Sequence, residues 1–486
     1  MAIYELREKM VTDRQRPRYH FVPPEGRWND LNGMIYWNGR YHVGYLQKIR
    51  NGPNERDFSS QQHISSRDLL HWKYHTASLR EPLPGMKGDY FNSGGIIHGA
   101  DVPTIITNMP RRGICVYQCF DDELDHWVPL PENPVIPLDS ETSKTTSLFP
   151  ESVIFDPSGW REGDTYYALI GNKNFRPGYE GDSTSLFASK NLREWEYIGP
   201  FYKSERRWTE EVEDCACSDF FPFGDKHMLL MHTHKPYAKC QYYIGRYEDR
   251  KFIPERNGQL SRLSAMVFGP ESLLDDRGRR IFLATIRDAR DWEETGWTNI
   301  FTLPWQFSPG PDNGLKIDPA EELTRLRYGG VGVDDFRARA GDELTIDELA
   351  SNCMEAKMTL IQEGATVFGI KLLCSPDGRE ETTVIYNSRA REFIVDFDKS
   401  STDTTLRYPQ NIRRQIIPYD SGGNPLCLDI FVDRSVIEIF VNSDVVLVQR
   451  VYPLLRDSTL MKVFAQDGAL RVINIELWEM DASNPW

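Results

Sequence analysis

The sequence predicts an all-β protein in which a β-propeller is followed by a β-sandwich. Asn-Gly and Asp-Gly dipeptides recur between short runs of β-branched and aromatic residues, a pattern typical of strands joined by tight turns. A Leu-x-x-Trp motif occurs three times in the first 200 residues, and a glycine- and charge-rich passage at 312–339 follows the propeller region. With 486 residues, the chain is too long for a single ordinary core.

Two hairpins are the clearest strand predictions. The runs Met34–Trp37 and Tyr41–Tyr45 flank Asn38-Gly39-Arg40, where Asn-Gly supplies the positive φ angles of a tight turn. Near the other end of the sequence, apolar and polar residues alternate with a period of two through Leu428–Asp433 and again through Ile437–Val441. We therefore expect each pair of runs to form two antiparallel strands.

The Leu-x-x-Trp motif supports the propeller. Its copies end at Trp72, Trp127 and Trp195, which are 55 and 68 residues apart. A strand-rich unit that recurs at such a spacing indicates propeller blades. We expect each motif to pack a loop onto its own blade, so that these Trp residues are structural. The motif stops near residue 200, but hairpin character continues to about residue 310.

The passage from 312 to 339 is interpreted as the link between two domains. It contains three closely spaced glycines and the acidic pair Asp334-Asp335. Strands with regular turns resume after it, which favours a β-sandwich. The predicted boundaries are residues 1–325 for the propeller and 335–486 for the sandwich. Within the second part, Leu344–Asn352 is the best candidate for a short helix.

Composition and charge exclude several classes of partner. A net charge of −15 and a pI near 5.3 give no electrostatic footprint for nucleic acid or for an anionic membrane. No run approaches 18 apolar residues, so we expect no membrane span. The first residues lack the apolar segment of a secretory signal, which predicts a cytoplasmic protein or a secreted one whose signal has been removed. The eight cysteines are scattered without a zinc pattern, which favours free thiols and no metal.

Candidate catalytic residues are sought among the carboxylates. Cleavage of a glycosidic bond needs two carboxyl groups at the anomeric carbon, one that attacks or stabilises and one that protonates the leaving oxygen. Asp30 precedes the first hairpin and Asp156 precedes another strand-like run, although Asp residues also make turns. An acidic cluster that contains Glu210, Glu211 and Glu213 borders an apolar strand, and chemistry alone does not distinguish these three residues. A solvated acidic face is the alternative interpretation of that cluster.

Motifs along nearly the whole chain carry a family resemblance. Tyr19–Pro24 followed by Trp28–Gly33, and later Phe155-Asp156-Pro157, are similar to motifs of glycoside hydrolase family 32, which contains invertases, inulinases, levanases and fructosyltransferases. The resemblance implies a five-bladed propeller before the sandwich. It also implies that Asp30 is the nucleophile and that Asp156 holds fructose hydroxyls and stabilises the transition state. Leu31 stands where the family usually has Pro, and Phe155 replaces the Arg of Arg-Asp-Pro, so one sugar contact must be absent or supplied from elsewhere.

The acid/base residue is harder to place by resemblance. The family carries it in Glu-Cys-Pro-Asp, and Cys217-Ser218-Asp219 is similar to the last three positions. The residue before Cys217 is Ala216, and the nearest Glu is Glu213, three residues further back. We therefore assign the acid/base role to Glu213, which a local bulge could bring to the centre of the propeller.

Other matches imply substrate contacts. Asn29, Gln47 and Ser93 are similar to sugar-binding positions of the family, and Glu271, in Gly-Pro-Glu-Ser, is expected to face the leaving group. The segment Leu428–Asn442 is similar to the family's sandwich signature, where Glu438 is expected to be structural. A literal Arg287-Asp288 follows Glu213 and so breaks the order of the family's motifs.

The resemblance implies a retaining double displacement without a metal or an organic cofactor. Asp30 and Glu213 should then lie roughly 5–5.5 Å apart. The expected activity is hydrolysis of terminal β-D-fructofuranosyl units of sucrose, inulin or levan by a monomer or homodimer. Alternatives that stay open are fructosyl transfer, including formation of a cyclic difructose, a non-catalytic sugar-binding propeller, and an inverting five-bladed glycosidase acting on pentosides.

Overall fold

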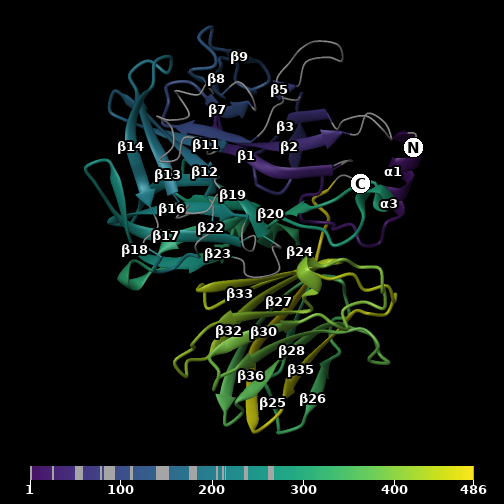
Figure 1. The fold of residues 1–486 in the computed structure, drawn as a ribbon. Coiled ribbons are helices and arrows are strands. Elements are labelled where there is room, and N and C mark those ends of the chain that lie inside the picture. Colours follow the sequence, from purple (N-terminus) through teal and green to yellow (C-terminus); the bar gives the residue numbers. More distant parts are fainter. Residues whose placement is uncertain are drawn as a thin grey trace.

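In the computed structural model of the chain, strands dominate and two bodies of β-sheet lie one above the other (Figure 1). The structure describes residues 3–23, 27–49, 58–76, 79–80, 93–109, 113–137, 153–173, 183–203, 206–210, 213, 215–234, 239–260 and 267–484. The prediction of an all-β protein is confirmed. The described helices are short, and none has the length and apolar character needed to cross a membrane. They are the α-helices α1 (Ile3–Thr12) and α3 (Trp292–Thr295) and the 3-10 helices η1 (Pro311–Asn313), η2 (Glu321–Leu326) and η3 (Pro409–Asn411).

The strands up to residue 319 form successive groups, which we term units 1 to 5. Within each unit neighbouring strands pair antiparallel, and the first strands of units 2 and 3 also pair with each other in parallel, so that these two units share one sheet. Unit 1 contains β1 (Arg27–Trp37), β2 (Arg40–Ile49), β3 (Phe58–Ser66), β4 (Trp72–Tyr74) and β5 (Leu79–Arg80). Unit 2 contains β6 (Gly94–His98), β7 (Thr104–Met109), β8 (Gly113–Cys119), β9 (Trp127–Pro129) and β10 (Ile136–Pro137). Unit 3 contains β11 (Val153–Glu162), β12 (Thr165–Lys173), β13 (Ser183–Ser189) and β14 (Glu196–Lys203).

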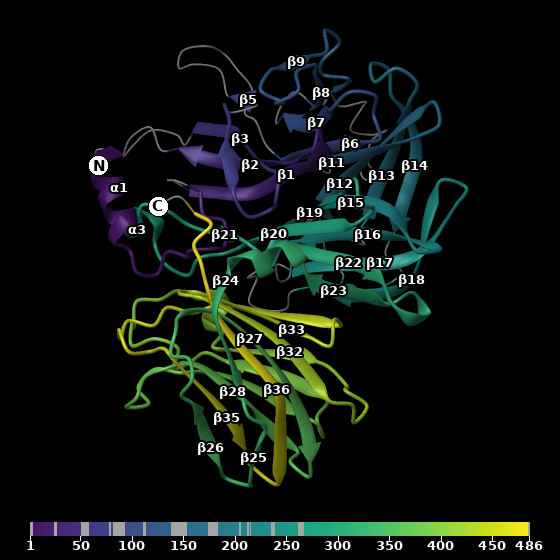
Figure 2. The ribbon, with the colours of Figure 1, turned by 180° about the vertical axis from the view of Figure 1, so that it is seen from behind.

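Units 4 and 5 continue the series. Unit 4 contains β15 (Ala216–Phe223), β16 (Lys226–Thr233), β17 (Lys239–Glu248) and β18 (Lys251–Gln259). Unit 5 contains β19 (Val267–Leu274), β20 (Arg280–Ile286), β21 (Ile300–Phe301), β22 (Trp305–Pro309) and β23 (Leu315–Pro319). The first strands of the units, β1, β6, β11, β15 and β19, contact one another in that order, and β19 contacts β1 again (Figure 2). The five first strands therefore surround one central axis.

The predicted hairpin at Asn38-Gly39 is confirmed, since β1 pairs with β2 and Trp37 faces Arg40 across the turn. The three Leu-x-x-Trp motifs also take one common structure. Each links the third strand of its unit to the fourth, and its Leu adopts a left-handed φ: 64° at Leu69, 57° at Leu124 and 65° at Leu192.

These motifs fasten loops, as predicted. The three Leu side chains are buried. The indole N–H groups of Trp127 and Trp195 each donate a 3.0 Å hydrogen bond to the carbonyl of their own motif Leu. Because the Leu is held in an unfavourable backbone region, its burial and the indole bond must outweigh that local cost.

The second body consists of two sheets. One contains β24 (Arg327–Val333), β25 (Phe336–Ala338), β27 (Cys353–Glu363), β32 (Leu426–Asp433), β33 (Val436–Val441), β34 (Val445–Arg450) and β36 (Ala469–Met480). The other contains β26 (Glu343–Ile346), β28 (Val367–Cys374), β29 (Thr382–Asn387), β30 (Glu392–Asp396), β31 (Arg414–Pro418) and β35 (Leu460–Ala465). The predicted hairpin near Leu428–Val441 is confirmed as β32 and β33.

The prediction of a short helix at Leu344–Asn352 is wrong. Its first residues belong to β26, which pairs antiparallel with β35 more than a hundred residues later. The remaining residues, 347–352, contain no helix. Pairing with a distant strand has overridden the local helical preference here, as tertiary contacts often do.

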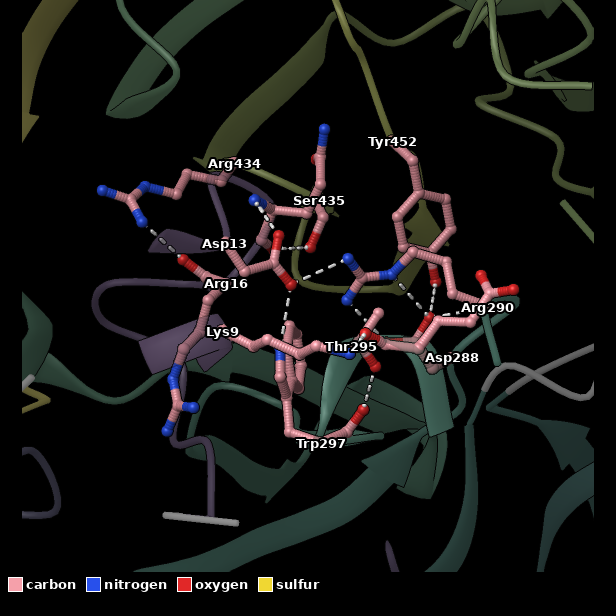
Figure 3. Close-up of polar contacts among 12 residues, drawn as sticks. Lys9, Asp13, Arg16, Asp288, Arg290, Thr295, Trp297, Arg434, Ser435 and Tyr452 are labelled. Atoms are coloured by element: carbon pink, nitrogen blue, oxygen red, sulfur yellow. Dashed lines mark hydrogen bonds and ion pairs between the residues drawn. The ribbon is translucent and has the colours of Figure 1, made fainter. Parts of the chain in front are cut away.

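A polar cluster joins the two bodies (Figure 3). The Asp288 carboxylate accepts hydrogen bonds from the Tyr452 hydroxyl at 2.7 Å and from Arg290, and lies 3.3 Å from Arg450. Burial opposes ionisation of this carboxyl, but the charges of Arg290 and Arg450 outweigh it and hold the pKa of Asp288 well below its usual value. The literal Arg287-Asp288 therefore lies in a junction between the bodies, which agrees with its place outside the family's motif order.

The segment that leads into unit 1 is held by the end of the second body. The side-chain amide of Asn484 donates hydrogen bonds to the carbonyls of Pro17, Arg18 and His20. His20 is fully buried between Asp433 and Glu438, at 3.0 and 3.3 Å. Glu438 also accepts hydrogen bonds from the Leu303 amide and the Trp305 indole, in agreement with its predicted structural role.

Candidate active site

Four of the five first strands carry the same bulge. In β1, β11, β15 and β19, two consecutive residues stand opposite one residue of the neighbouring strand. A bulge of this kind bends a strand and redirects a side chain, and it is frequent beside active sites. The bulged pairs are Asn29-Asp30 and Asn32-Gly33 in β1, Asp156-Pro157 in β11, Cys217-Ser218 in β15 and Gly269-Pro270 in β19. The first residue of the last three pairs has a positive φ: 51° at Asp156, 48° at Cys217 and 57° at Gly269.

Asp30 is half-buried in the bulge of β1 and is contacted from two other units. The Ser93 hydroxyl, just before β6, donates a hydrogen bond of 3.2 Å to Asp30 Oδ2. Gly269 lies beside the same side chain, because a Cβ on Gly269 would stand 3.5 Å from both Cβ and Oδ1 of Asp30. Units 1, 2 and 5 therefore meet at this carboxylate, and a hydrogen bond fixes its orientation.

Asp156 and Cys217 form the other half of the cluster. The Cys217 thiol donates a hydrogen bond of 3.7 Å to Asp156 Oδ2, which links units 3 and 4. Burial, followed by the charges of Asp156, Asp30 and Glu271, raises the pKa of the Cys217 thiol well above its usual value. The thiol therefore stays protonated as a donor, and three carboxyl groups lie within electrostatic range of its sulfur.

Glu271 is buried one residue beyond the bulge of β19. Burial, with the charges of Asp219 and Asp156, raises the pKa of Glu271 well above its usual value, although the Gly33 N–H partly opposes this. Such an environment favours the protonated form of the carboxyl group, which is the form that a general acid needs. Asp219 occupies the corresponding place in β15, where it accepts a hydrogen bond from the Ser272 hydroxyl.

Glu213 lies in a different kind of environment. Its side chain is fully buried, and Lys239 Nζ is 2.5 Å from Oε1. The Glu210 backbone N–H donates to the same oxygen at 3.0 Å, and the Gln241 side chain donates to Oε2 at 3.3 Å. Both carboxylate oxygens are therefore engaged by groups of unit 4 and the segment that leads into it.

The remaining predicted substrate contacts are only partly described. Gln47 is buried on β2, where its backbone pairs opposite Trp28. The backbone of Asn29 is part of the first bulge, whereas its side chain lies outside the described part of the structure, as does the side chain of Phe155. Among the predicted residues, the structure brings Asp30, Ser93, Asp156 and Glu271 together, through the Ser93 hydrogen bond and through Cys217 as a shared neighbour.

Comparison with known proteins identifies the family. A family model described as "Glycosyl hydrolases family 32 N-terminal domain" matches residues 20–317, and one described as "Glycosyl hydrolases family 32 C terminal" matches residues 322–479. The chain belongs to glycosyl hydrolase family 32. Together the two matches cover most of its length.

Curated relatives within the family are distant in sequence but similar in extent. A protein named sucrose-6-phosphate hydrolase from Zymomonas mobilis is 23% identical over 98% of this chain and 94% of its own length. A levanase from Bacillus subtilis is 23% identical over 95% of this chain and 70% of its own length.

Solved structures share the fold. Fructan 1-exohydrolase IIa from Cichorium intybus has a TM-score of 0.81 at 18% identity, covering 97% of this chain and 98% of the other. A sucrose-6-phosphate hydrolase from Lactobacillus gasseri has a TM-score of 0.79 at 19% identity, covering 99% and 96%. The architecture of the chain is therefore that of the family 32 structures.

The two departures from the family's motifs occupy equivalent places. Phe155, at the position of the family's Arg, directly precedes the positive-φ residue of the β11 bulge. Ala216, which the resemblance matches to the Glu of Glu-Cys-Pro-Asp, directly precedes the positive-φ residue of the β15 bulge. Both changes replace a polar side chain at the start of a first strand with an apolar one, so the local chemistry differs from the usual motif at two neighbouring points of the ring.

Sequence reasoning missed the contributions of Cys217 and Gly269. A signal for both was present, because Asp156-Pro157 and Gly269-Pro270 share a proline in second place and Cys217-Ser218 holds the matching position in unit 4. An alignment of the first strands of the units with one another puts Asp156, Cys217 and Gly269 at the same position, the first residue of a bulge.

Proposed function

We propose that the chain is a retaining β-fructosidase that removes terminal β-D-fructofuranosyl units from sucrose or fructans. The observation that carries the proposal is the half-buried Asp30, oriented by Ser93 in a ring layer that also holds Asp156. Relatives named sucrose-6-phosphate hydrolase, raffinose invertase and levanase support fructosides as the substrate class. Gln47, Ser93 and Asn29 are proposed to contact the fructosyl unit.

The proposed reaction is a double displacement. An Asp30 carboxylate oxygen attacks the anomeric carbon, the bond to the leaving oxygen breaks, and the acid residue protonates that oxygen. Water then attacks the same carbon and gives a proton to the acid residue, now a base, and the Asp30 carboxylate is released. Asp156 accepts hydrogen bonds from the sugar and stabilises the positive charge that develops in both steps.

We propose Glu213 as the acid/base residue, following its position before Cys217-Ser218-Asp219. A second candidate is Glu271, which is favoured by its environment: it is buried among carboxyl groups, and its pKa is raised. Glu213 by contrast is engaged in an ion pair with Lys239, at 2.5 Å. Variants at the two positions separate these assignments, as described below.

We also propose that units 1 to 5 are the five blades of a propeller and that the two sheets of the second body form a sandwich, with boundaries at 1–325 and 335–486. The closed contact order of the first strands and the separate strand pairing of the second body support this division. Because β24 pairs with β36, residues 327–333 belong to a sheet of the second body, which supports a start of the sandwich near 327 rather than at 335.

The first experiment is an incubation of the protein, beside an Asp30→Ala variant, with sucrose, sucrose 6-phosphate, inulin and levan, followed by chromatography of the products. Release of fructose, with glucose 6-phosphate when the substrate is sucrose 6-phosphate, supports the hydrolase if the Asp30→Ala variant does not release it. Larger or cyclic fructosides would instead assign a transferase. Carbon-13 NMR of C2 in the fructose that is released first tests retention, because this anomeric carbon bears no proton.

A non-catalytic sugar-binding protein is the second candidate function. It is favoured by the apolar residues Phe155 and Ala216 at two motif positions and by the closed ion pair of Glu213. Calorimetric binding of fructosides without turnover by the folded protein would establish it. Turnover that depends on Asp30 would reject it.

A further inference from the structure

A histidine cluster lies between units 1 and 2, away from the bulged layer of the ring. His63 is on β3, His75 directly follows β4, and Asp125 lies in the loop between β8 and β9. One ligand atom of each residue lies within 4.8 Å of the other two. The rings of His63 and His75 stack with their centroids 4.2 Å apart. Three side chains that commonly bind a divalent cation thus converge from two units.

The cluster contains a buried nitrogen with no hydrogen-bond partner in the described part of the chain. His63 Nδ1 is this atom, and the side chain of His63 is only 4% exposed. It faces Asp125 Oδ1 at 4.0 Å, too far for a hydrogen bond. His75 Nδ1 lies 3.0 Å from the same oxygen. An unsatisfied buried nitrogen is costly, so a missing ligand is a physical explanation for this arrangement.

The second nitrogen of each imidazole is already held. His63 Nε2 lies 2.9 Å from His42 Nδ1, and His75 Nε2 lies 2.7 Å from the Ser65 hydroxyl. Metal-bound histidines use their other ring nitrogen in this way, since a hydrogen bond there fixes the tautomer and the ring orientation. Both Nδ1 atoms are therefore directed toward Asp125 by neighbours on β2 and β3.

The charges around the cluster suit a cation. The nearby ammonium of Lys73 is paired with Glu123 at 2.6 Å, and the Asp121 carboxylate adds negative charge near His63. The side chain of Asp125 is 29% exposed, so a cation can reach it from solvent.

We propose that His63, His75 and Asp125 bind one zinc ion, or a first-row divalent cation of similar preference, that joins unit 1 to unit 2. Two imidazole nitrogens and one carboxylate oxygen form a donor set that Zn²⁺ commonly takes. His42 and Ser65 position the two imidazoles. Because the ligands come from both units, the bound ion stabilises their contact, independently of the activity proposed for the ring.

The test uses the full chain after treatment with a chelator. Zn²⁺ is titrated against a chromophoric competitor, and Co²⁺ is added to a second sample to record the absorption bands of the bound ion. We expect one ion per chain and a melting temperature that rises with Zn²⁺. His63→Ala and Asp125→Asn should each weaken binding at least tenfold and abolish the rise, and His42→Ala should weaken binding by about 10–100-fold.

His126→Ala is the matched control, because His126 belongs to the same loop and is 88% exposed. It should bind Zn²⁺ as the unchanged protein does. Asp125→Asn preserves shape at a partly exposed position, so it reports on binding even if a histidine variant fails to fold. Absence of stoichiometric binding in the unchanged protein, or equal binding in Asp125→Asn, would overturn the proposal.

Discussion

The Cys217 thiol donates a hydrogen bond of 3.7 Å to the Asp156 carboxylate, joining the bulges of two neighbouring strands. Replacement of Cys217 by Ala removes this donor. A hydrogen bond of this kind contributes about 1 kcal/mol, so kcat/KM for fructoside hydrolysis should fall roughly fivefold. Cys427→Ala, at an exposed thiol of the second body, should leave the rate unchanged. An unaltered rate in Cys217→Ala would show that Asp156 is oriented without it.

The roles of Glu213 and Glu271 are separated by a substrate whose leaving group needs no proton. If Glu213 is the acid, Glu213→Gln should lower sucrose hydrolysis by about 10²–10⁴-fold while hydrolysis of fructosyl fluoride is largely retained. Glu271→Gln should then keep both activities within about tenfold. The reverse pattern would transfer the role to Glu271. Thermal unfolding is measured for both, since Glu213→Gln also leaves Lys239 without its partner.

The contact between Gly269 and Asp30 gives a test with a matched control. Gly269→Ala places a methyl group 3.5 Å from Asp30 Oδ1, which should hinder approach of the sugar and lower kcat/KM by about tenfold. Gly163→Ala carries a similar backbone cost, because φ is 58° there and 57° at Gly269, but the added methyl meets open space. Both variants should lose similar stability, and only Gly269→Ala should lose activity. Equal activities would exclude the proposed approach beside Gly269.

The buried Asp288 should make stability depend on acid pH. Its pKa is held below the usual 3.8, so its contribution is complete above that pH and is lost as the pH falls from there toward the lower folded-state pKa. Asp288→Asn leaves Arg290 and Arg450 without their partner and should lower the free energy of unfolding by about 3–5 kcal/mol at pH 7. Urea titrations should show that the difference in unfolding free energy between Asp288→Asn and the unchanged protein becomes smaller at acid pH. Asp398→Asn, at an exposed carboxylate, should show neither effect.

The buried His20 should make stability depend on pH in the direction opposite to that of Asp288. Burial alone would lower its pKa, but the hydrogen bonds and charges of Asp433 and Glu438 outweigh burial and raise it above 6.5. The stabilisation is therefore complete below pH 6.5 and is lost as the pH rises through the higher folded-state pKa. Urea unfolding between pH 6 and 9 should show this decline in the unchanged protein and in His126→Gln, but not in His20→Gln. A parallel decline in His20→Gln would assign the pH dependence to another group.

Local patterns predicted local structure well. The Asn38-Gly39 turn, the alternation through Leu428–Val441 and the Leu-x-x-Trp motif each depend on a few adjacent residues, and all three were confirmed. The helix expected at Leu344–Asn352 failed because its strand partner, β35, lies far along the chain.

The candidate site was less accessible to such reasoning. Asp30 and Asp156 were expected just before strands, whereas the structure has both inside first strands, in the bulges of β1 and β11. Their catalytic roles stay predictions. Nothing near Glu213 in the sequence indicates its ion pair with Lys239, which lies 26 residues away. The same limit applies to the histidine cluster, since His63 lies in unit 1 and Asp125 in unit 2. Contacts of this kind depend on how units meet, and no local pattern encodes them.

The hydrogen bonds from Asn484 to the carbonyls of residues 17–20 have a consequence for the order of folding. During synthesis from the N-terminus, residues 17–20 leave the ribosome long before their partners at 483–484 exist. The segment that leads into β1 therefore remains without these hydrogen bonds until the last strand of the second body has been made. Unit 1 is the first unit to be synthesised, yet the segment that leads into it forms these hydrogen bonds among the last of the chain.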